Sequence, residues 1–243
     1  MGVFRFKQFS VDDSGSAMKI GTDGVLLGAW ARAAGCGTVI DAGAGTGLIA
    51  LMMAQRYDNI CVKGIELDGS ACHDARSNVA LSPWADRIEI VHGDVLAWRP
   101  DENSRMSGGA LRIVSNPPFF TEQLRSPDSA RALARHGGGF CVESLIEWAS
   151  GIMSGPDDAL SFIAPAERDD EIQYLLALHR LAPVRVTDVV SREGRAPVRR
   201  LYEVGCDSNI SQPCSRDTLV IRTADGNYSP EYISLTAPFY INL

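Results

Sequence analysis

The sequence lacks the features that define several large protein classes. None of its 243 residues lies in an apolar run long enough to cross a membrane as a helix, and the first residues lack the apolar centre of a secretory signal. Its six cysteines are scattered, with no Cys-x-x-Cys pair and no histidines at matching spacing. Neither a disulfide framework nor a metal site is therefore expected. These absences favour a globular protein of the reducing cytoplasm.

Positive charge is also scarce. The 23 lysine and arginine residues are outnumbered by 30 acidic residues, which gives a formal net charge of −7. Because broad, non-specific nucleic-acid binding depends on neutralising phosphates, this balance disfavours that class of protein. It does not exclude a local basic surface. The length and the ordinary share of hydrophobic residues, 45%, fit one large α/β domain.

The most informative stretch is residues 38–53. A short apolar run ends near Asp41, glycines follow at every second position, and an apolar segment of helical character comes next. This is the pattern of a buried strand, a tight turn and a helix packed back on the strand. Glycines permit positive φ and close approach of a ligand, and the first N–H groups of the helix can receive an anion. The glycines are Gly43, Gly45 and Gly47.

The residues after this turn suggest which ligand it holds. Dinucleotide sites use Gly-x-Gly-x-x-Gly, and the spacing here is one residue shorter. A second predicted strand ends at Glu66, whose carboxylate can accept both hydroxyls of a ribose. A third is followed by Asp94, which can accept from an adenine amino group with Val95 against the ring, or can simply cap a turn. The glycine turn with Asp41 and Glu66 resembles the S-adenosylmethionine site of class I methyltransferases; a dinucleotide site and a plain tight turn are the alternatives.

A second motif, Asn116-Pro117-Pro118-Phe119, follows the predicted strand at residues 111–115. The two prolines stiffen the turn and remove two N–H donors, so the Asn116 side chain and the Pro117 carbonyl can both face a ligand as acceptors. An exocyclic amine offers two N–H donors, and this pair would aim its nitrogen at an electrophile while Phe119 stacks on the base. A rigid structural turn is the alternative. Because the Asn-Pro-Pro-Phe motif follows the glycine motif in the chain, we favour the interpretation that it is the catalytic loop of an amino-methylating enzyme.

The first 33 residues contain a candidate cover for the cofactor. Thr22 or Asp23 can cap a helix over the apolar residues that follow. A helix cap explains neither Lys19 nor the glycines that flank Thr22 and Asp23. We therefore predict that residues 1–33 form an N-terminal segment folding over the methionine end of the cofactor.

Two basic segments accompany the predicted site. Residues 121–139 form a glycine-containing loop of a length that is usually functional or disordered, and residues 191–200 form a polar turn with the densest basic patch of the chain. We interpret the first as a mobile, basic lid beside the mouth of the active site, and the second can grip the phosphates of an RNA. A merely solvated loop is the alternative for each. The candidate RNA-binding residues are Arg125, Arg131, Arg135, His136, Arg195, Arg199 and Arg200.

Several segments together resemble the bacterial tRNA(Val) adenine(37)-N6-methyltransferases, and the resemblance spans nearly the whole chain. It implies S-adenosylmethionine-dependent methylation of the N6 amine of the adenine next to the anticodon of a valine tRNA. The segments that carry it are Phe6–Phe9, Lys19–Gly24, Gly28–Trp30, Gly45–Met52, Ser82–Trp84, Ser115–Phe120, Ala134–His136 and Arg199–Leu201.

The resemblance also assigns roles by position. Asn116, Pro117, Pro118 and Phe119 would hold the target base as the catalytic residues. The cofactor-binding residues would be Lys19, Gly21, Thr22, Asp41, Gly43, Gly45, Thr46, Gly47, Glu66, Asp94, Val95 and Asn116.

We expect a single Rossmann-like α/β methyltransferase domain over residues 1–243. Its sheet should have seven strands, mostly parallel, with helices on both faces and late antiparallel strand character that includes residues 218–223. S-adenosylmethionine should bind at the carboxyl ends of the central strands. Alternative targets are guanine N2 in ribosomal RNA, adenine N6 in DNA and a protein glutamine. A non-catalytic S-adenosylmethionine- or RNA-binding module is the alternative of another class. We expect a monomer that binds neither metal nor membrane.

Overall fold

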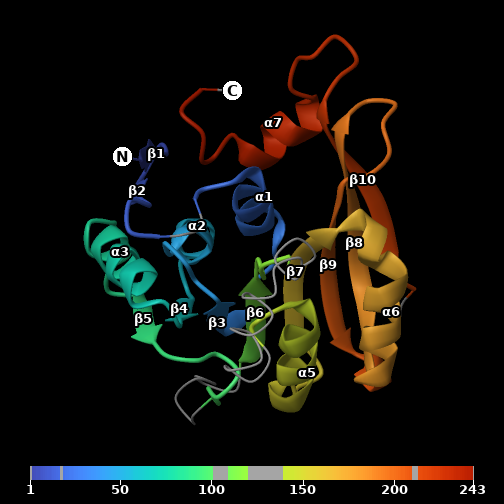
Figure 1. Cartoon of the computed structure of the whole chain (residues 1–243), viewed down its shortest axis with the longest axis horizontal. Coiled ribbons are helices and arrows are strands. Elements are labelled where there is room, and N and C mark those ends of the chain that lie inside the picture. Colours follow the sequence, from blue (N-terminus) through green and yellow to red (C-terminus); the bar gives the residue numbers. More distant parts are fainter. Residues whose placement is uncertain (1, 17–18, 101–108, 120–138, 210–212, 243) are drawn as a thin grey trace, which may run out of the picture.

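The computed structural model describes residues 2–16, 19–100, 109–119, 139–209 and 213–242. Its centre is an eight-stranded sheet in the order β10-β8-β9-β7-β6-β3-β4-β5 (Figure 1). The strands are β3 (Cys36–Ala42), β4 (Cys61–Glu66), β5 (Ile88–His92), β6 (Ala110–Ser115), β7 (Ala159–Pro165), β8 (Leu181–Arg192), β9 (Arg199–Cys206) and β10 (Ser215–Arg222).

Strand direction confirms one prediction and corrects another. β9 runs antiparallel to β7 and β8, whereas every other pair in the sheet is parallel. The predicted count of seven strands is wrong, because β10 adds an eighth. The antiparallel character predicted for residues 218–223 is also wrong: β10 follows β9 in the chain but does not pair with it. Since both edges of β9 are already paired, β10 joins the free edge of β8 and is parallel to it.

Helices cover both faces of the sheet (Figure 1). One hydrophobic core lies under α1 (Thr22–Trp30), α2 (Leu48–Arg56), α3 (Gly69–Ala80) and α7 (Pro230–Thr236), and the other lies under α5 (Val142–Ile152) and α6 (Asp169–Leu178). Short 3-10 helices span Ala166–Arg168 and Asp207–Asn209. Adjacent residues of a strand serve opposite cores: Val39 belongs to the first and Ile40 to the second. The central strands are mainly apolar because both of their faces are buried.

The first residues pack against the last. A hairpin of β1 (Val3–Arg5) and β2 (Ser10–Asp12) precedes the sheet, and Phe6 forms a bridge to Tyr240 near the other end of the chain (Figure 1). Phe6 stacks on Phe9 with 4.7 Å between ring centroids and on Tyr240 with 6.0 Å. These aromatic contacts anchor the segment that leads into α1.

Within the described ranges, no helix combines the length and apolarity that a membrane span needs.

Candidate functional site

The glycine turn between β3 and α2 adopts a backbone that only glycine takes easily. Gly43, Gly45 and Gly47 have φ of 73°, 54° and 79°. A side chain in this left-handed region costs roughly 1–2 kcal/mol. At Gly43 a Cβ would also lie 2.7 Å from the ring of Phe140. Backbone conformation and a close neighbour therefore both require glycine there, and the predicted turn is confirmed.

Asp41 supports the turn from beneath. Its side chain is fully buried, and Oδ2 accepts a hydrogen bond from the backbone N–H of Ala50 in α2 at 3.0 Å. Burial raises the pKa of Asp41 to about 7, against the opposing effect of this hydrogen bond. Oδ1 has no hydrogen-bond partner in the described part of the chain. Asp41 does not line the cavities described below, so its predicted contact with the cofactor stays a prediction.

Glu66, the last residue of β4, reaches across to the same turn. Its Oε2 accepts from the backbone N–H of Gly45 at 2.7 Å, and its Oε1 accepts from that of Asp68 at 2.8 Å. Each carboxylate oxygen has a further lone pair that can accept from a ligand hydroxyl. One side chain thus fixes the edge of the turn and presents acceptors beside it.

Asp94 follows β5 at the neighbouring strand end. Its Oδ1 accepts from the backbone N–H of Leu96 at 2.9 Å, so the turn-cap interpretation is confirmed for this oxygen. Val95 beside it is buried. Both residues line one cavity with Glu66. This agrees with the sequence-based expectation, because the carboxyl ends of the neighbouring parallel strands β4 and β5 lie side by side.

Two cavities meet at the Asn116 loop. The first, of about 500 Å³, lies over the ends of β4 and β5, where Glu66, Asp94 and Val95 face Phe140. The second, of about 550 Å³, lies between residues 19–24 and residues 116–119. Both volumes are within the range of small-molecule sites. The residues common to the two cavities are Gly43, Gly45, Asn116 and Pro118.

The Asn116 loop leaves β6 at a fixed position. The hydroxyl of Ser115, fully buried, donates to the carbonyl of Ala42 at 2.7 Å and so aligns the ends of β6 and β3. Pro117 is buried, whereas Asn116 and Phe119 are partly exposed. No hydrogen bond of the Asn116 amide is found within the described residues. The predicted acceptor is therefore available where the two cavities join.

The segment before α1 and the first residue of α1 form a wall of the second cavity. Lys19, Gly21 and Thr22 line it opposite Thr46 of the glycine turn, whereas Gly47 lies outside it. The Nζ of Lys19 donates to the carbonyl of Asp13, which holds the segment in shape. The structure thus brings these predicted cofactor residues together.

Asn78 of α3 ties this segment to the glycine turn. Its amide Nδ2 donates to the carbonyls of Asp12 and Thr46 at 2.9 and 3.0 Å, and its Oδ1 accepts from the N–H of Asp12 at 2.8 Å. A buried amide that satisfies three backbone groups fixes two chain segments relative to each other. The sequence pattern of α3 does not reveal this role.

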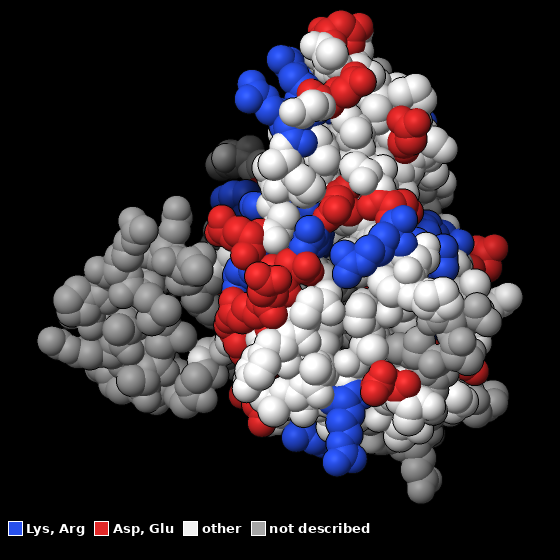
Figure 2. Space-filling model, turned by 90° about the vertical axis from the view of Figure 1, so that its right-hand side faces the viewer, with Lys and Arg blue, Asp and Glu red and all other residues white. Residues whose placement is uncertain are grey.

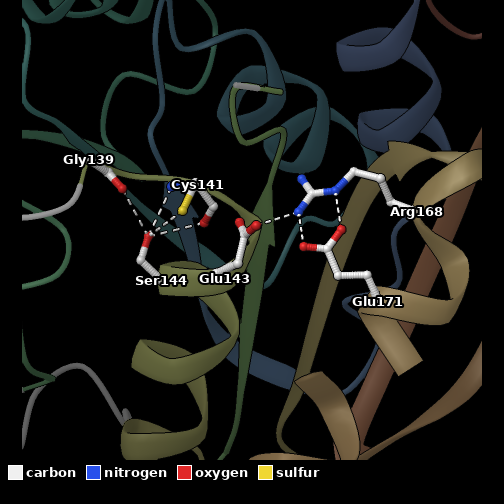
Figure 3. Close-up of polar contacts among 6 residues, drawn as sticks. All are labelled: Gly139, Cys141, Glu143, Ser144, Arg168 and Glu171. Carbon is white, nitrogen blue, oxygen red and sulfur yellow. Dashed lines mark hydrogen bonds and ion pairs between the residues drawn. The ribbon is translucent and has the colours of Figure 1, made fainter. Parts of the chain in front are cut away.

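Phe140 is a wall residue that the sequence did not identify. It precedes α5. The first turn of this helix carries Glu143, which pairs with Arg168, and Arg168 also pairs with Glu171 (Figure 3). Arg168 donates from Nε and Nη2 to the two carboxylate oxygens of Glu171 at 2.8 and 2.7 Å, and from Nη2 also to Glu143 of α5. Two-point pairing fixes the guanidinium plane. This anchor holds the start of α5, and with it Phe140, against Gly43.

The candidate RNA-binding residues have different outcomes. Arg195 is exposed on the turn between β8 and β9. Arg200 is paired with Asp169 and Asp188, so its charge is compensated inside the protein, and Arg199 is paired with a residue of α1. On the side of the molecule at β10, acidic and basic side chains are intermixed (Figure 2). The remaining candidates, Arg125, Arg131, Arg135 and His136, lie outside the described residues.

No group of three or more histidine, cysteine or acidic residues that could hold a metal ion occurs in the described ranges. The sheet order, the antiparallel β9, the glycine turn and the acidic strand ends define instead the class I methyltransferases. A sequence model of the methyltransferase small domain family matches residues 14–140.

Comparisons with known proteins refine this class. The chain is 44% identical to the tRNA1(Val) (adenine(37)-N6)-methyltransferase of Porphyromonas gingivalis W83, over 98% of this chain and 94% of the relative. It is 39% identical to the enzyme of the same name from Aeromonas hydrophila, over 99% and 98%. A predicted O-methyltransferase from Agrobacterium tumefaciens has the same fold, with a TM-score of 0.62 and 21% identity over 91% of this chain and 100% of that one. The chain belongs to the tRNA1(Val) (adenine(37)-N6)-methyltransferase family. Its cofactor is S-adenosylmethionine.

Proposed function

We propose that this protein transfers a methyl group from S-adenosylmethionine to the N6 amine of an adenine in the anticodon loop of tRNA, at position 37 of a valine tRNA. The observation that carries the proposal is the amide of Asn116, which has no hydrogen-bond partner among the described residues and lies where the two cavities join. The names of the relatives support the choice of substrate. We place the activity in the cytoplasm, in a monomer whose single domain spans residues 1–243.

The residues of the first cavity fit the nucleoside part of the cofactor. Glu66 offers acceptors for ribose hydroxyls, and the free oxygen of Asp94 can accept from the adenine amino group. Val95 and Phe140 supply apolar surface for the ring. The glycine turn permits close approach of the backbone. When bound, S-adenosylmethionine supplies a methyl group on a positively charged sulfur.

The second cavity fits the methionine end and the target base. Lys19 and Thr22 supply polar contacts on its outer wall, within the N-terminal segment 1–33 that we propose as the cofactor cover. On the inner wall, the Asn116 Oδ1 and the Pro117 carbonyl accept the two hydrogens of the target amine and aim its nitrogen at the methyl group. Phe119 stacks on the base. Positioning of this kind accelerates the reaction without a strong base.

The proposed target does not require a duplex to be opened. An anticodon-loop base is already unpaired, so it can turn into the cavity at low cost. The RNA would approach the carboxyl ends of the strands, and Arg195 is exposed on the turn that follows the end of β8. The local basic residues, rather than the net charge of −7, would contact the phosphates.

The Asn116→Ala variant tests the catalytic assignment. Methyl transfer to unmodified tRNA should fall by about a hundredfold or more, because the target amine loses its aligning acceptor. S-adenosylmethionine affinity, measured by calorimetry, should change by less than about threefold. Asn227→Ala is the matched control, since Asn227 lies in an exposed turn before α7. Full activity in Asn116→Ala would refute the assignment.

A further inference from the structure

Arg199 lies where three segments of the site converge. As the first residue of β9 it pairs with Pro165, the last residue of β7, and so stands at the carboxyl edge of the sheet. Its side chain lines the second cavity together with Asp23 of α1 and Phe119 of the catalytic loop. The sequence pattern treats Arg199 as one member of a basic turn. The structure gives it a different environment.

Three contacts fix the guanidinium of Arg199. Its Nε donates to Oδ2 of Asp23 at 2.8 Å, in an ion pair whose side chains are only 34% and 25% exposed. Its central carbon lies 5.1 Å from the centroid of the Phe119 ring. Nη1 donates to the carbonyl of Val198 at 3.0 Å, which restricts the guanidinium further. The aromatic ring of the catalytic loop is thereby held against a cation that is itself anchored.

This arrangement decides between two roles for the charge. An arginine that neutralises a phosphate needs its charge free and its donors turned to solvent. At Arg199 the charge is already compensated by Asp23. A planar guanidinium over an aromatic face restricts how the ring can tilt, which an ammonium group cannot reproduce.

We propose that Arg199 is a positioning residue for the target base. It orients the Phe119 ring, on which the base stacks, and acts through that ring rather than through an RNA phosphate. This inference rests on the proposed function of the Asn116 loop. It assigns the Asp23–Arg199 pair as the element that sets the angle at which the base meets Asn116.

Replacement of Arg199 by lysine separates the two roles. Arg199→Lys keeps the charge and loses the planar group. The positioning role predicts that kcat falls about tenfold in both Arg199→Lys and Arg199→Gln, with KM for tRNA changed by less than about threefold. A phosphate contact predicts the opposite: near wild-type behaviour for Arg199→Lys, and a raised KM for Arg199→Gln. Arg216→Gln serves as the control. It removes one positive charge at the amino end of β10, away from the carboxyl ends of the strands where the site lies.

A double-mutant cycle tests whether Arg199 acts through Phe119. Arg199→Lys should lower kcat about tenfold in the wild-type background and less than about twofold in a Phe119→Leu background, because the ring it orients is then gone. Equal losses in the two backgrounds would overturn the proposal. Thermal unfolding of each variant identifies any that fail to fold.

A readout independent of turnover accompanies the cycle. The Arg199 Nε–H resonance should carry a ring-current shift that disappears in Phe119→Leu and persists in Asn227→Ala. An unchanged resonance would contradict the contact.

If the wild-type chain leaves tRNA unmethylated, the proposed substrate is refuted. The double-mutant cycle is then measured with the acceptor that the chain does methylate. If Arg199→Lys lowers kcat equally with and without Phe119, the proposed role of Arg199 is overturned, whatever the substrate.

Discussion

At the scale of single residues, Glu66 combines structure and binding. Its carboxylate accepts two backbone N–H groups, one of them from the glycine turn at 2.7 Å. Removing it therefore loses the proposed ribose acceptors and also frees the N–H of Gly45. Both effects weaken the same cavity.

We predict that Glu66→Ala lowers S-adenosylmethionine affinity by about tenfold or more, consistent with losing hydrogen bonds to a charged acceptor. Isothermal calorimetry measures this directly. The control is Glu89→Ala, which removes a carboxylate that pairs with Lys63 on the adjoining strand, outside both cavities. Affinity unchanged in Glu66→Ala would remove this residue from the site.

Asp41 makes stability depend on pH. Burial raises its pKa in the folded protein to about 7, whereas an unfolded aspartate has a pKa near 4. Between these values the folded state keeps a proton that the unfolded state releases. The contribution of Asp41 to the free energy of unfolding is therefore fully present below pH 4 and is lost as the pH rises through 7.

The Asp41→Asn variant should not show this loss. From pH 5.5 to 8, the wild-type free energy of unfolding should fall by about 2 kcal/mol relative to that of Asp41→Asn. Denaturant titrations at both pH values measure the difference. Asp58→Asn, at an exposed position, should behave like the wild type. Parallel pH profiles for the wild type and Asp41→Asn would contradict the raised pKa.

Residues at strand ends could be predicted from the sequence, whereas long-range partners could not. Glu66 and Asn116 follow apolar runs, so their place at the carboxyl edge is evident from local pattern. The pairing of Arg199 with Asp23 joins residues 176 positions apart, and no local pattern encodes it. Phe140 is equally hidden, because its role depends on how α5 packs against Gly43.

At the scale of elements, the glycine turn shapes both cavities. Gly43 and Gly35 have nearly the same positive φ, 73° and 75°, but only Gly43 has a neighbour, Phe140, that a Cβ would meet. Comparing the two positions separates backbone strain from the loss of the close approach.

We predict that Gly43→Ala and Gly35→Ala both lose about 1 kcal/mol of stability from the strained backbone. Only Gly43→Ala should also lose S-adenosylmethionine affinity, by about tenfold, because its Cβ displaces the Phe140 wall. Chemical denaturation and calorimetry supply the two values. Equal affinities for the two variants would show that the turn does not shape the cavity.

The elements themselves follow closely from the sequence. Apolar runs predict the central strands, and Asp68 caps α3 through the N–H of Ala71 as its type and position favour. The helix α2 begins at Leu48, directly after the glycine turn, because Gly47 is left-handed. The pairing of β10 could not be predicted, since its neighbour is decided by which sheet edge remains free.

At the scale of the whole molecule, the sheet concentrates the chemistry at one edge. The cofactor cavity, the Asn116 loop and the Asp23–Arg199 pair all lie where β3, β4, β6 and β7 end. The net charge of the chain is negative, and the face beside β10 mixes both signs (Figure 2).

The most direct test is to identify and locate the methylated nucleoside. The purified chain is incubated with isotopically labelled S-adenosylmethionine and unmodified bulk tRNA, and nuclease fragments are sequenced by mass spectrometry. The account predicts labelled N6-methyladenosine at position 37 of a valine tRNA. Label on a guanine amine, on another tRNA position, or only on ribosomal RNA or protein would contradict it.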